Sequence, residues 1–207
     1  MVEETFLGEP MPLNPNPQGK GLVPVLEHWE SHRPTDVAAK PPRQLLGDYL
    51  VSLLILSASF GFKPVAERGY HLYLCDGQWQ LSLIAPWEWP NVATRLYAGE
   101  CQLRTDMTWQ LTPSENLQDY PELVAALEAF QAGFVELLSS DAPLEDDLPL
   151  YVARLPFYQR LLATGLSASL RRSTQAAKRE GISARQWLGS VKSEQLTLMP
   201  GSTAVSG

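Results

Sequence analysis

The chain has few of the residues that catalytic and metal-binding sites use. Its 207 residues include three His and two Cys, and charged residues account for 19%. Two cysteines, each on an expected strand, are too few for the disulfide framework of a small secreted domain, so we expect two reduced thiols. Hydrophobic residues reach 44%, which is enough for a sizeable core in one domain with helical extensions.

Long hydrophobic runs are also missing. The most apolar stretch, residues 50–58, is far shorter than the roughly 20 residues that a membrane-spanning helix needs. The start of the chain is acidic and rich in proline, and it lacks the basic residues and the apolar run of a signal peptide. We therefore predict a cytoplasmic protein with no membrane partner. The net charge of −7 argues against nucleic-acid binding by the whole surface, although not by a local basic patch.

Catalytic and metal sites have weak candidates. His28 and His32 are four residues apart and could share a helix face, but no third ligand is evident, so we predict two exposed histidines and no metal. His71 lies about 13 Å along a strand from Cys75, too far for a Cys–His catalytic pair. We expect no catalytic residue and no cofactor. An enzyme of unrecognised type, with a polar site near His71 or Glu88, stays open as an alternative.

The segment from Tyr70 to Leu111 is the most informative part of the chain. Asp76-Gly77 predicts a two-residue hairpin turn, because both positions accept a positive φ. This turn places Cys75 opposite Gln78 and so sets the register. Alternation then puts six apolar residues on one face, namely Tyr70, Leu72, Leu74, Trp79, Leu81 and Leu83. The opposite face is mostly polar and carries His71, Tyr73, Cys75, Gln78, Gln80 and Ser82.

Two further strands continue this alternation. Their apolar positions, which we expect on the same face, are Tyr97, Cys101, Leu103, Met107, Trp109 and Leu111. One apolar face needs a cover, which helices must supply. The predicted fold class is α+β: a four-stranded antiparallel meander with helices covering one face, plus a C-terminal helical extension.

Apolar residues at helical spacing predict the covering helices. We expect them over residues 42–60, 121–138 and 156–180, with Ser183 capping a short last helix, a further short helix at 22–29 and a linker at 33–42. We divide the chain into four parts. These are a flexible proline-rich arm (1–21), an α+β core domain (22–140), an acidic loop with a basic helical extension packed on the core (141–199) and a disordered tail (200–207).

Charge is unevenly distributed along the second half of the chain. Residues 113–150 hold nine acidic residues and no Lys or Arg, whereas residues 151–192 hold eight Lys or Arg against one Glu. Four of the basic residues fall on one side of the expected helix: Arg171, Arg172, Lys178 and Arg179. This face either balances the acidic segment within the fold, contacts RNA or DNA, or binds an acidic protein.

The loop from Pro86 to Pro90 places two tryptophans beside prolines. Trp87 and Trp89 either pack as a lid on the edge of the core or form an exposed aromatic recognition surface, since aromatic residues concentrate at interface hot spots. Glu88 between them could orient a backbone donor or a partner cation.

These residues, taken in order, resemble those of a known family. The pattern comprises Tyr70, Leu72-Tyr73, Gly77, Leu81-Ser82-Leu83-Ile84, Pro86, Glu88-Trp89, Tyr97, Gly99, Leu103 and Asp106-Met107-Thr108-Trp109. It is similar to the family catalogued as domain of unknown function 2452, and the earlier run Pro15–Pro24 is similar to its bacterial members. The resemblance covers roughly residues 14–112. It implies no activity, cofactor or catalytic residue.

The predicted function is that of a non-catalytic protein-binding or adaptor module with an unknown protein partner. Its surface would combine the loop residues Trp87, Glu88 and Trp89 with the polar sheet face around His71 and Tyr73. The first alternative is an RNA- or DNA-associated protein that uses Arg171, Arg172, Lys178 and Arg179.

Overall fold

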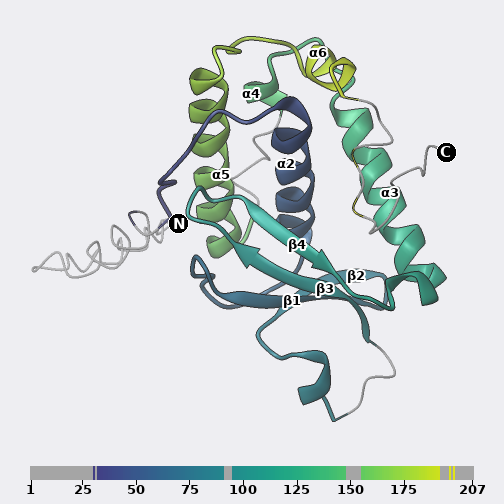
Figure 1. Cartoon of the computed structure of the whole chain (residues 1–207). Helices are drawn as coiled ribbons and strands as arrows, with labels where there is room; N and C mark the ends of the chain where they lie inside the picture. Colours follow the sequence, from purple (N-terminus) through teal and green to yellow (C-terminus); the bar gives the residue numbers. More distant parts are fainter. Residues whose placement is uncertain are drawn as a thin grey trace, which may run out of the picture. The chain divides into compact units, whose positions relative to one another are not determined.

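The computed structural model describes residues 30, 32–90, 95–147, 155–191, 196 and 198. The chain divides into two units, residues 1–31 and residues 32–207, and the second contains the α-helices and strands labelled in Figure 1 and two short 3-10 helices, η1 and η2. The elements are, in order, α2 (Pro42–Ser57), β1 (Gly69–Cys75), β2 (Gln78–Ser82), η1 (Pro86–Glu88), β3 (Arg95–Leu103), β4 (Trp109–Pro113), η2 (Leu117–Asp119), α3 (Pro121–Leu137), α4 (Leu144–Asp147), α5 (Phe157–Ala176) and α6 (Ala184–Gly189). The predicted arm, first helix and tail lie outside the described residues.

The predicted hairpin forms in the predicted register. Asp76 and Gly77 both have positive φ, 49° and 73°, and β1 pairs with β2 so that Cys75 lies opposite Gln78. The pairing continues to His71 opposite Ser82. The apolar positions of this hairpin form most of the inner face of the sheet, where Tyr70, Leu72, Leu74 and Leu81 are buried. The α+β fold with a four-stranded antiparallel sheet is therefore confirmed.

The order of the strands differs from that of a meander. The sheet runs β2-β1-β3-β4, so that β3 pairs with β1 rather than with β2. The connection from β2 to β3 must then cross β1. Figure 1 shows the described part of this connection on the side of the sheet opposite to the helices, which we call the outer face.

A bulge in β3 changes which residues face outward. The pairing of β1 with β3 shifts between Leu72 and Tyr73, so that Leu72 lies opposite Gly99 but Tyr73 lies opposite Tyr97. The extra residue, Ala98, is buried. Because one added residue reverses the alternation, Tyr97 lies beside Tyr73 on the outer face, and its predicted place on the apolar face is wrong.

Three helices cover the inner face. Figure 1 shows α2, α3 and α5 on one side of the sheet, with α2 between the other two. The central helix contacts β2, β4, α3 and α5, which explains why its predicted apolar stripe is so wide. A hydrogen bond of 2.9 Å from the Trp109 backbone N–H to Ser52 Oγ fixes α2 against β4. The core continues into the C-terminal helices through Leu162, Leu166 and Trp187.

The C-terminal helices differ from the prediction in length. The helix expected over residues 156–180 ends at Ala176, where Lys178 takes a left-handed φ of 55° ahead of Gly181. Part of the predicted acidic loop forms the short helix α4. The predicted cap of the last helix is confirmed, since Ser183 Oγ accepts a hydrogen bond from the Gln186 backbone N–H at 3.3 Å.

The predicted linker at residues 33–42 is irregular but is held against the core. Thr35 donates its backbone N–H to Thr105 O at 2.9 Å. From α5, Arg172 donates to Pro34 O at 2.7 Å and Ser173 donates to Ala38 O at 2.9 Å. These bonds hold residues 33–41 against the β3–β4 turn and against α5. We call this segment the strap.

The bulge generates a stability prediction. Gly99 has a φ of +154°, and an added Cβ would lie 2.2 Å from Thr112 O. We expect Gly99→Ala to lower the free energy of unfolding by about 3 kcal/mol, through backbone strain and the clash. Gly47→Ala in α2, where an added Cβ meets nothing within 4 Å, should instead raise it by roughly 0.5–1 kcal/mol. Urea unfolding measures both, and equal effects would contradict the assigned bulge.

Candidate functional site: the outer face of the sheet

The connection that crosses the outer face is built around the short helix η1. Pro86 opens it with the φ that a first helical position requires. Glu88 Oε2 accepts the Ala85 backbone N–H at 2.8 Å, and Ala85 O accepts the Glu88 N–H at 3.0 Å. These reciprocal bonds close the turn and fix the directions of the tryptophans on either side of Glu88.

Trp89 anchors the turn to the sheet. Its ring meets that of Tyr73 edge-on, with centroids 6.4 Å apart, and the Arg95 guanidinium lies over the ring, 3.8 Å from its centroid. Tyr73 is 1% exposed and donates its hydroxyl to Ile84 O at 2.8 Å. Arg95 also donates to Gln80 at 3.3 Å. Trp89 and Tyr73 therefore hold the turn against the outer face of the sheet.

Trp87 points away from this anchor and is 81% exposed. Its contact with the sheet is an edge-on approach to His71, with ring centroids 6.0 Å apart. Leu83 and Ile84, which precede the turn, are also exposed. The crossing connection thus presents three large apolar side chains to solvent on a backbone that the Glu88 cap and the Trp89 anchor hold.

His71 and Tyr97 form the polar part of the same face. His71 Nδ1 lies 3.3 Å from the Tyr97 hydroxyl. Burial lowers the pKa of His71, while Glu100 and Glu88 act more weakly in the opposite direction. Burial also raises the pKa of Tyr97 to about 12, with smaller contributions from Tyr73 and Glu100. At neutral pH both groups are uncharged, so this part of the surface offers hydrogen bonds but little charge.

The structure brings the predicted site residues together but gives them unequal access to a partner. Trp87 and Glu88 are exposed, His71 and Trp89 are partly buried, and Tyr73 is covered. The sequence prediction left Ile84 and Arg95 out of the site and placed Leu83 and Tyr97 on the covered apolar face. Leu83 is 42% exposed, so its predicted burial is wrong. Tyr97 could not be placed on the outer face from alternation alone, because the bulge reverses the alternation. The packing of Arg95 on Trp89 could not be predicted without the order of the strands.

The four basic residues predicted to share one helical face do not do so. Arg171 and Arg172 lie on α5, whereas Lys178 and Arg179 follow its end. Besides Arg172, which bonds the strap, Arg179 lies 5.4 Å from the centroid of Trp187. Arg171 lines a cavity beside acidic residues of α4. Nucleic-acid contact through these residues stays a prediction, and its assumption of one continuous helix is wrong.

A partly buried ion-pair network joins three segments, and the sequence prediction missed it. Lys40 Nζ of the strap lies 2.6 Å from both Asp48 of α2 and Asp106 of the β3–β4 turn. Asp48 also pairs with Arg104 at 3.0 Å. Asp106 accepts hydrogen bonds from the Thr108 hydroxyl and backbone N–H at 2.6 and 3.0 Å. The two bonds from Thr108 to Asp106 close the β3–β4 turn.

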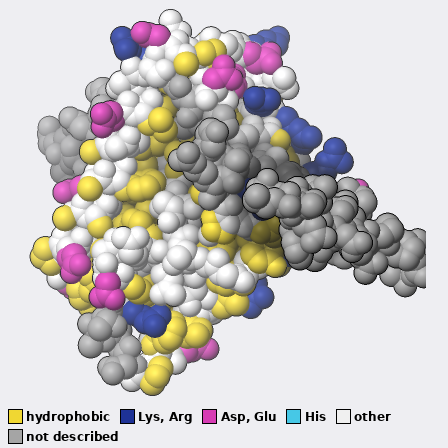
Figure 2. Space-filling view, turned by 180° about the vertical axis from the view of Figure 1, so that it is seen from behind, with side chains coloured by type: hydrophobic (Ala, Val, Ile, Leu, Met, Phe, Trp, Pro, Cys, Tyr) yellow, Lys and Arg dark blue, Asp and Glu magenta, His cyan; other side chains and the backbone are white. Residues whose placement is uncertain are grey.

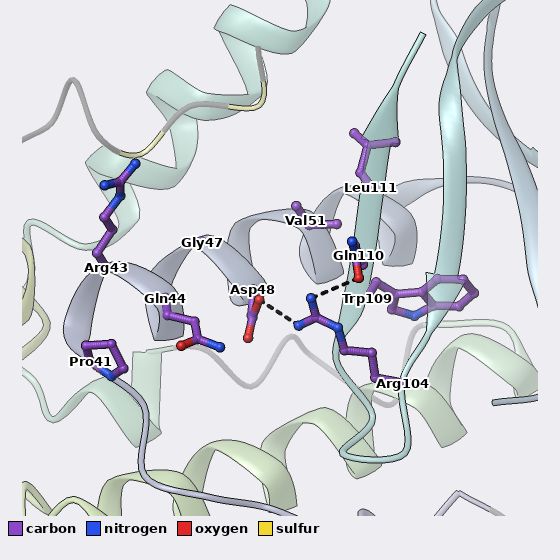
Figure 3. Close-up of a pocket in the computed structure, with 10 residues that line it drawn as sticks. All are labelled: Pro41, Arg43, Gln44, Gly47, Asp48, Val51, Arg104, Trp109, Gln110 and Leu111. Carbon is purple, nitrogen blue, oxygen red and sulfur yellow. Dashed lines mark hydrogen bonds and ion pairs between the residues drawn. The ribbon is translucent and has the colours of Figure 1, made fainter. Parts of the chain in front are cut away.

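A cavity of about 360 Å³ lies beside this network, between the start of α2 and the β3–β4 hairpin. Figure 3 shows Arg104 reaching from the hairpin to Asp48 and Gln110, while the Arg43 side chain points away from them. Figure 3 also shows the Trp109 ring on the far side of its strand from Arg104. Within this cavity Arg104 is already paired with Asp48 and Gln110, so these three side chains join the hairpin to α2.

The remaining predictions concern the histidines, metal binding, membrane helices and the two cysteines. His32 is buried, so its predicted exposure is wrong, and His28 lies outside the described residues. Within the described parts of the chain, three or more His, Cys, Asp or Glu side chains nowhere gather as a metal site would need. Among these same residues, every helix is too short or too polar to cross a membrane. Cys75 and Cys101 are both free.

The ion-pair network generates a second stability prediction. Burial raises the pKa of Asp106, but hydrogen bonds from Lys40 and Thr108 outweigh it, so that the pKa lies below its ordinary value. Lys40→Met would remove the cation that Asp48 and Asp106 share, while Asp48 would keep Arg104 and Asp106 would keep Thr108. We expect this change to lower the free energy of unfolding by about 2 kcal/mol at neutral pH. Lys178→Met, which removes an exposed Lys, should have almost no effect in the same urea titration. A small loss in Lys40→Met would contradict the assigned network.

His71 generates a prediction on pH. Its pKa is lower in the folded protein than the ordinary value of 6.5, so the unfolded chain binds the proton more readily. Stability should therefore fall as the pH drops through about 6.5 towards the folded pKa, and it should not change above this window. We expect the thermal midpoint to fall between pH about 7.5 and about 5.5, and to fall less in His71→Gln. An unchanged pH dependence in this variant would show that another group is responsible.

Residues 43–132 match the family described as "protein of unknown function (DUF2452)". No curated protein and no solved structure matches the chain. The match begins after the predicted Pro15–Pro24 run and extends into α3, so it includes the sheet, the crossing connection and the Asp106–Trp109 turn. The predicted resemblance is therefore confirmed as a match to this family over residues 43–132, rather than over the predicted 14–112.

Proposed function

We propose that the protein is a non-catalytic protein-binding module and that Trp87 is the centre of its contact surface. The observation that carries this proposal is that the Trp87 side chain is 81% exposed, on a turn that Trp89 and Tyr73 hold against the sheet. A Trp side chain contributes a large apolar area when it becomes buried. An exposed Trp is therefore an unfavourable arrangement in the free protein unless a partner covers it.

The organisation of the turn supports binding rather than loose packing. Its backbone is fixed by the Glu88 cap, and Trp89 holds it to the sheet through contacts with Tyr73 and Arg95. A partner would therefore bind a side chain that is already positioned, which reduces the entropy lost on association. Leu83 and Ile84 of the same connection are also exposed, and His71 beside Trp87, together with Tyr97, supplies polar groups. An apolar centre with a polar rim is the usual composition of a protein interface.

The chemistry of the surface indicates the kind of partner. The Trp87 side chain would enter an apolar cleft, since a flat surface would leave much of the indole in water. Glu88 is exposed beside it and has one carboxylate oxygen engaged in the cap. A partner with an apolar pocket and a backbone or cationic donor at its rim would satisfy both groups.

The other two functions remain predictions that no particular contact favours. Two of the four basic residues proposed for nucleic acid, Arg172 and Arg179, already contact the protein itself. For an enzyme, His71 has a lowered pKa and a Tyr97 neighbour, but the nearby carboxylate, Glu88, closes the turn through Ala85.

A pull-down from a native extract, with and without nuclease, tests the proposal. The baits are the wild-type chain, Trp87→Ala, and Phe157→Ala as a control that removes a 39% exposed aromatic residue elsewhere. We expect a protein partner that survives nuclease, that the control retains, and that Trp87→Ala binds at least about tenfold more weakly in a subsequent titration. Because Trp87 is exposed, its removal should leave the melting temperature of the bait nearly unchanged.

Two results would overturn the proposal. One is a partner that Trp87→Ala binds as well as the wild type does. The other is recovery of nucleic acid, or of proteins that nuclease removes, in binding that weakens steeply with salt.

A further inference from the structure

A second surface of the molecule, remote from the Trp87 turn, is an apolar groove between α2 and α3. It has a volume of about 520 Å³ and is lined by Leu53 and Leu56 of α2, by α3 residues that include Phe130, Gly133 and Leu137, and by Leu155 ahead of α5. Figure 2 shows apolar side chains gathered on the rear of the molecule, on the side where α3 lies. The groove belongs to the helical layer, whereas the Trp87 turn lies on the outer face of the sheet.

Small residues on the α3 side of the groove leave room for a second helix to come close to the α3 backbone. Ala129, Gly133 and Leu137 follow one another at intervals of four residues, so they form one stripe along the helix. All three are exposed, and a Cβ added at Gly133 would meet nothing within 4 Å. Small residues in such a stripe let another helix approach the backbone closely. Leu137, 40% exposed, closes one end.

The rim of the groove is acidic. Glu122 and Glu136 lie seven residues before and after Ala129, so helical periodicity places all three on the same side of α3. Both glutamates are exposed. The surrounding segment, residues 113–150, has nine acidic residues and no Lys or Arg, and Figure 2 shows Asp and Glu side chains along this edge of the molecule. An apolar groove with carboxylates beside it is complementary to a helix that has an apolar stripe flanked by cations.

We propose that this groove binds a basic amphipathic α-helix of a partner protein. The apolar side chains of that helix would fill the space between α2 and α3, and its Lys or Arg side chains would meet Glu122 and Glu136. These glutamates are about 21 Å apart along the helix axis, as 14 residues at 1.5 Å each require. A partner helix of about four turns or more would therefore reach both.

The charge of the rim separates this occupant from two others. An anionic membrane surface would be repelled by Glu122 and Glu136, because membrane-binding helices present Lys and Arg to acidic lipids. A second copy of the chain docked through the same α3 face would place two acidic rims together, which is unfavourable. A basic helix is the partner whose charge the rim attracts.

A synthetic helical peptide is the direct probe. One peptide of about 18 residues, long enough to form a helix, carries Leu at helical spacing and Lys elsewhere, and its counterpart carries Glu in place of Lys. We expect the full chain to bind the Lys peptide in a fluorescence anisotropy titration and to bind the Glu peptide at least about tenfold more weakly.

Matched glycine variants locate the binding. Gly133→Gln puts a polar side chain into the groove without a clash, and Gly47→Gln does the same in α2 outside it, since neither added Cβ meets anything within 4 Å. We expect Gly133→Gln to weaken Lys-peptide binding by at least about tenfold, and Gly47→Gln to leave it unchanged. Glu122→Lys together with Glu136→Lys should weaken it about fivefold at low salt. Trp87→Ala should leave it unchanged, so failure here is distinguishable from failure of the proposed function.

Four results would overturn the proposal. The first is equal binding of both peptides. The second is equal weakening by Gly133→Gln and Gly47→Gln. The third is stronger binding to vesicles of anionic lipid than to the Lys peptide, which would make the groove a membrane contact. The fourth is sedimentation that shows a dimer lost in Gly133→Gln, which would make a second copy the occupant.

Discussion

The pairing of β3 with β1 is the constraint on which the outer face depends. Because β2 already occupies the other edge of β1, the chain that leaves β2 has to pass over β1 before β3 can begin. It passes over the outer face, since α2 covers the inner one. A connection in this position needs an anchor on the sheet, and Trp89 against Tyr73 provides it. Trp87 lies inside the 3-10 turn and Trp89 at its end, and at three residues per turn side chains two residues apart point in different directions. Trp89 therefore faces the sheet while Trp87 is exposed.

The ion-pair network has a different effect on the fold. Lys40, Asp48 and Asp106 come from segments far apart in the chain, and they meet where the strap, α2 and the β3–β4 turn converge. Removing charges from water is unfavourable, so such a network adds little net stability compared with apolar side chains of the same size. It does require three segments to meet at one place, because any other arrangement would leave a buried charge unpaired. This explains why an irregular strap lies in a defined position without secondary structure of its own.

Local patterns in the sequence predicted the elements well. The Asp76-Gly77 turn determined the register of β1 and β2, and apolar spacing located α2 and α3 to within a few residues. Features that depend on distant parts of the chain were not predictable in this way. One residue, Ala98, reverses the alternation and moves Tyr97 to the other face, and alternation alone cannot reveal a bulge. The pairing of Lys40 required knowing that a proline-flanked segment would return to the hairpin turn. Gly181 suggested the end of α5, but the helix ends earlier, with a left-handed Lys178.

The two proposed surfaces share no residue and lie on opposite sides of the sheet. The surface on the outer face of the sheet centres on the exposed Trp87 side chain, whose backbone is held by the turn. The surface in the helical layer is an apolar groove with acidic residues beside it. The sheet between them is a hydrogen-bonded layer whose inner side chains are close-packed, which leaves little room for a change at one surface to reach the other. Two partners bound in this way would bind independently, with affinities that neither one alters. Their joint effect would be to bring two proteins together at a fixed distance. This is the task of an adaptor, and it needs neither a catalytic residue nor a cofactor.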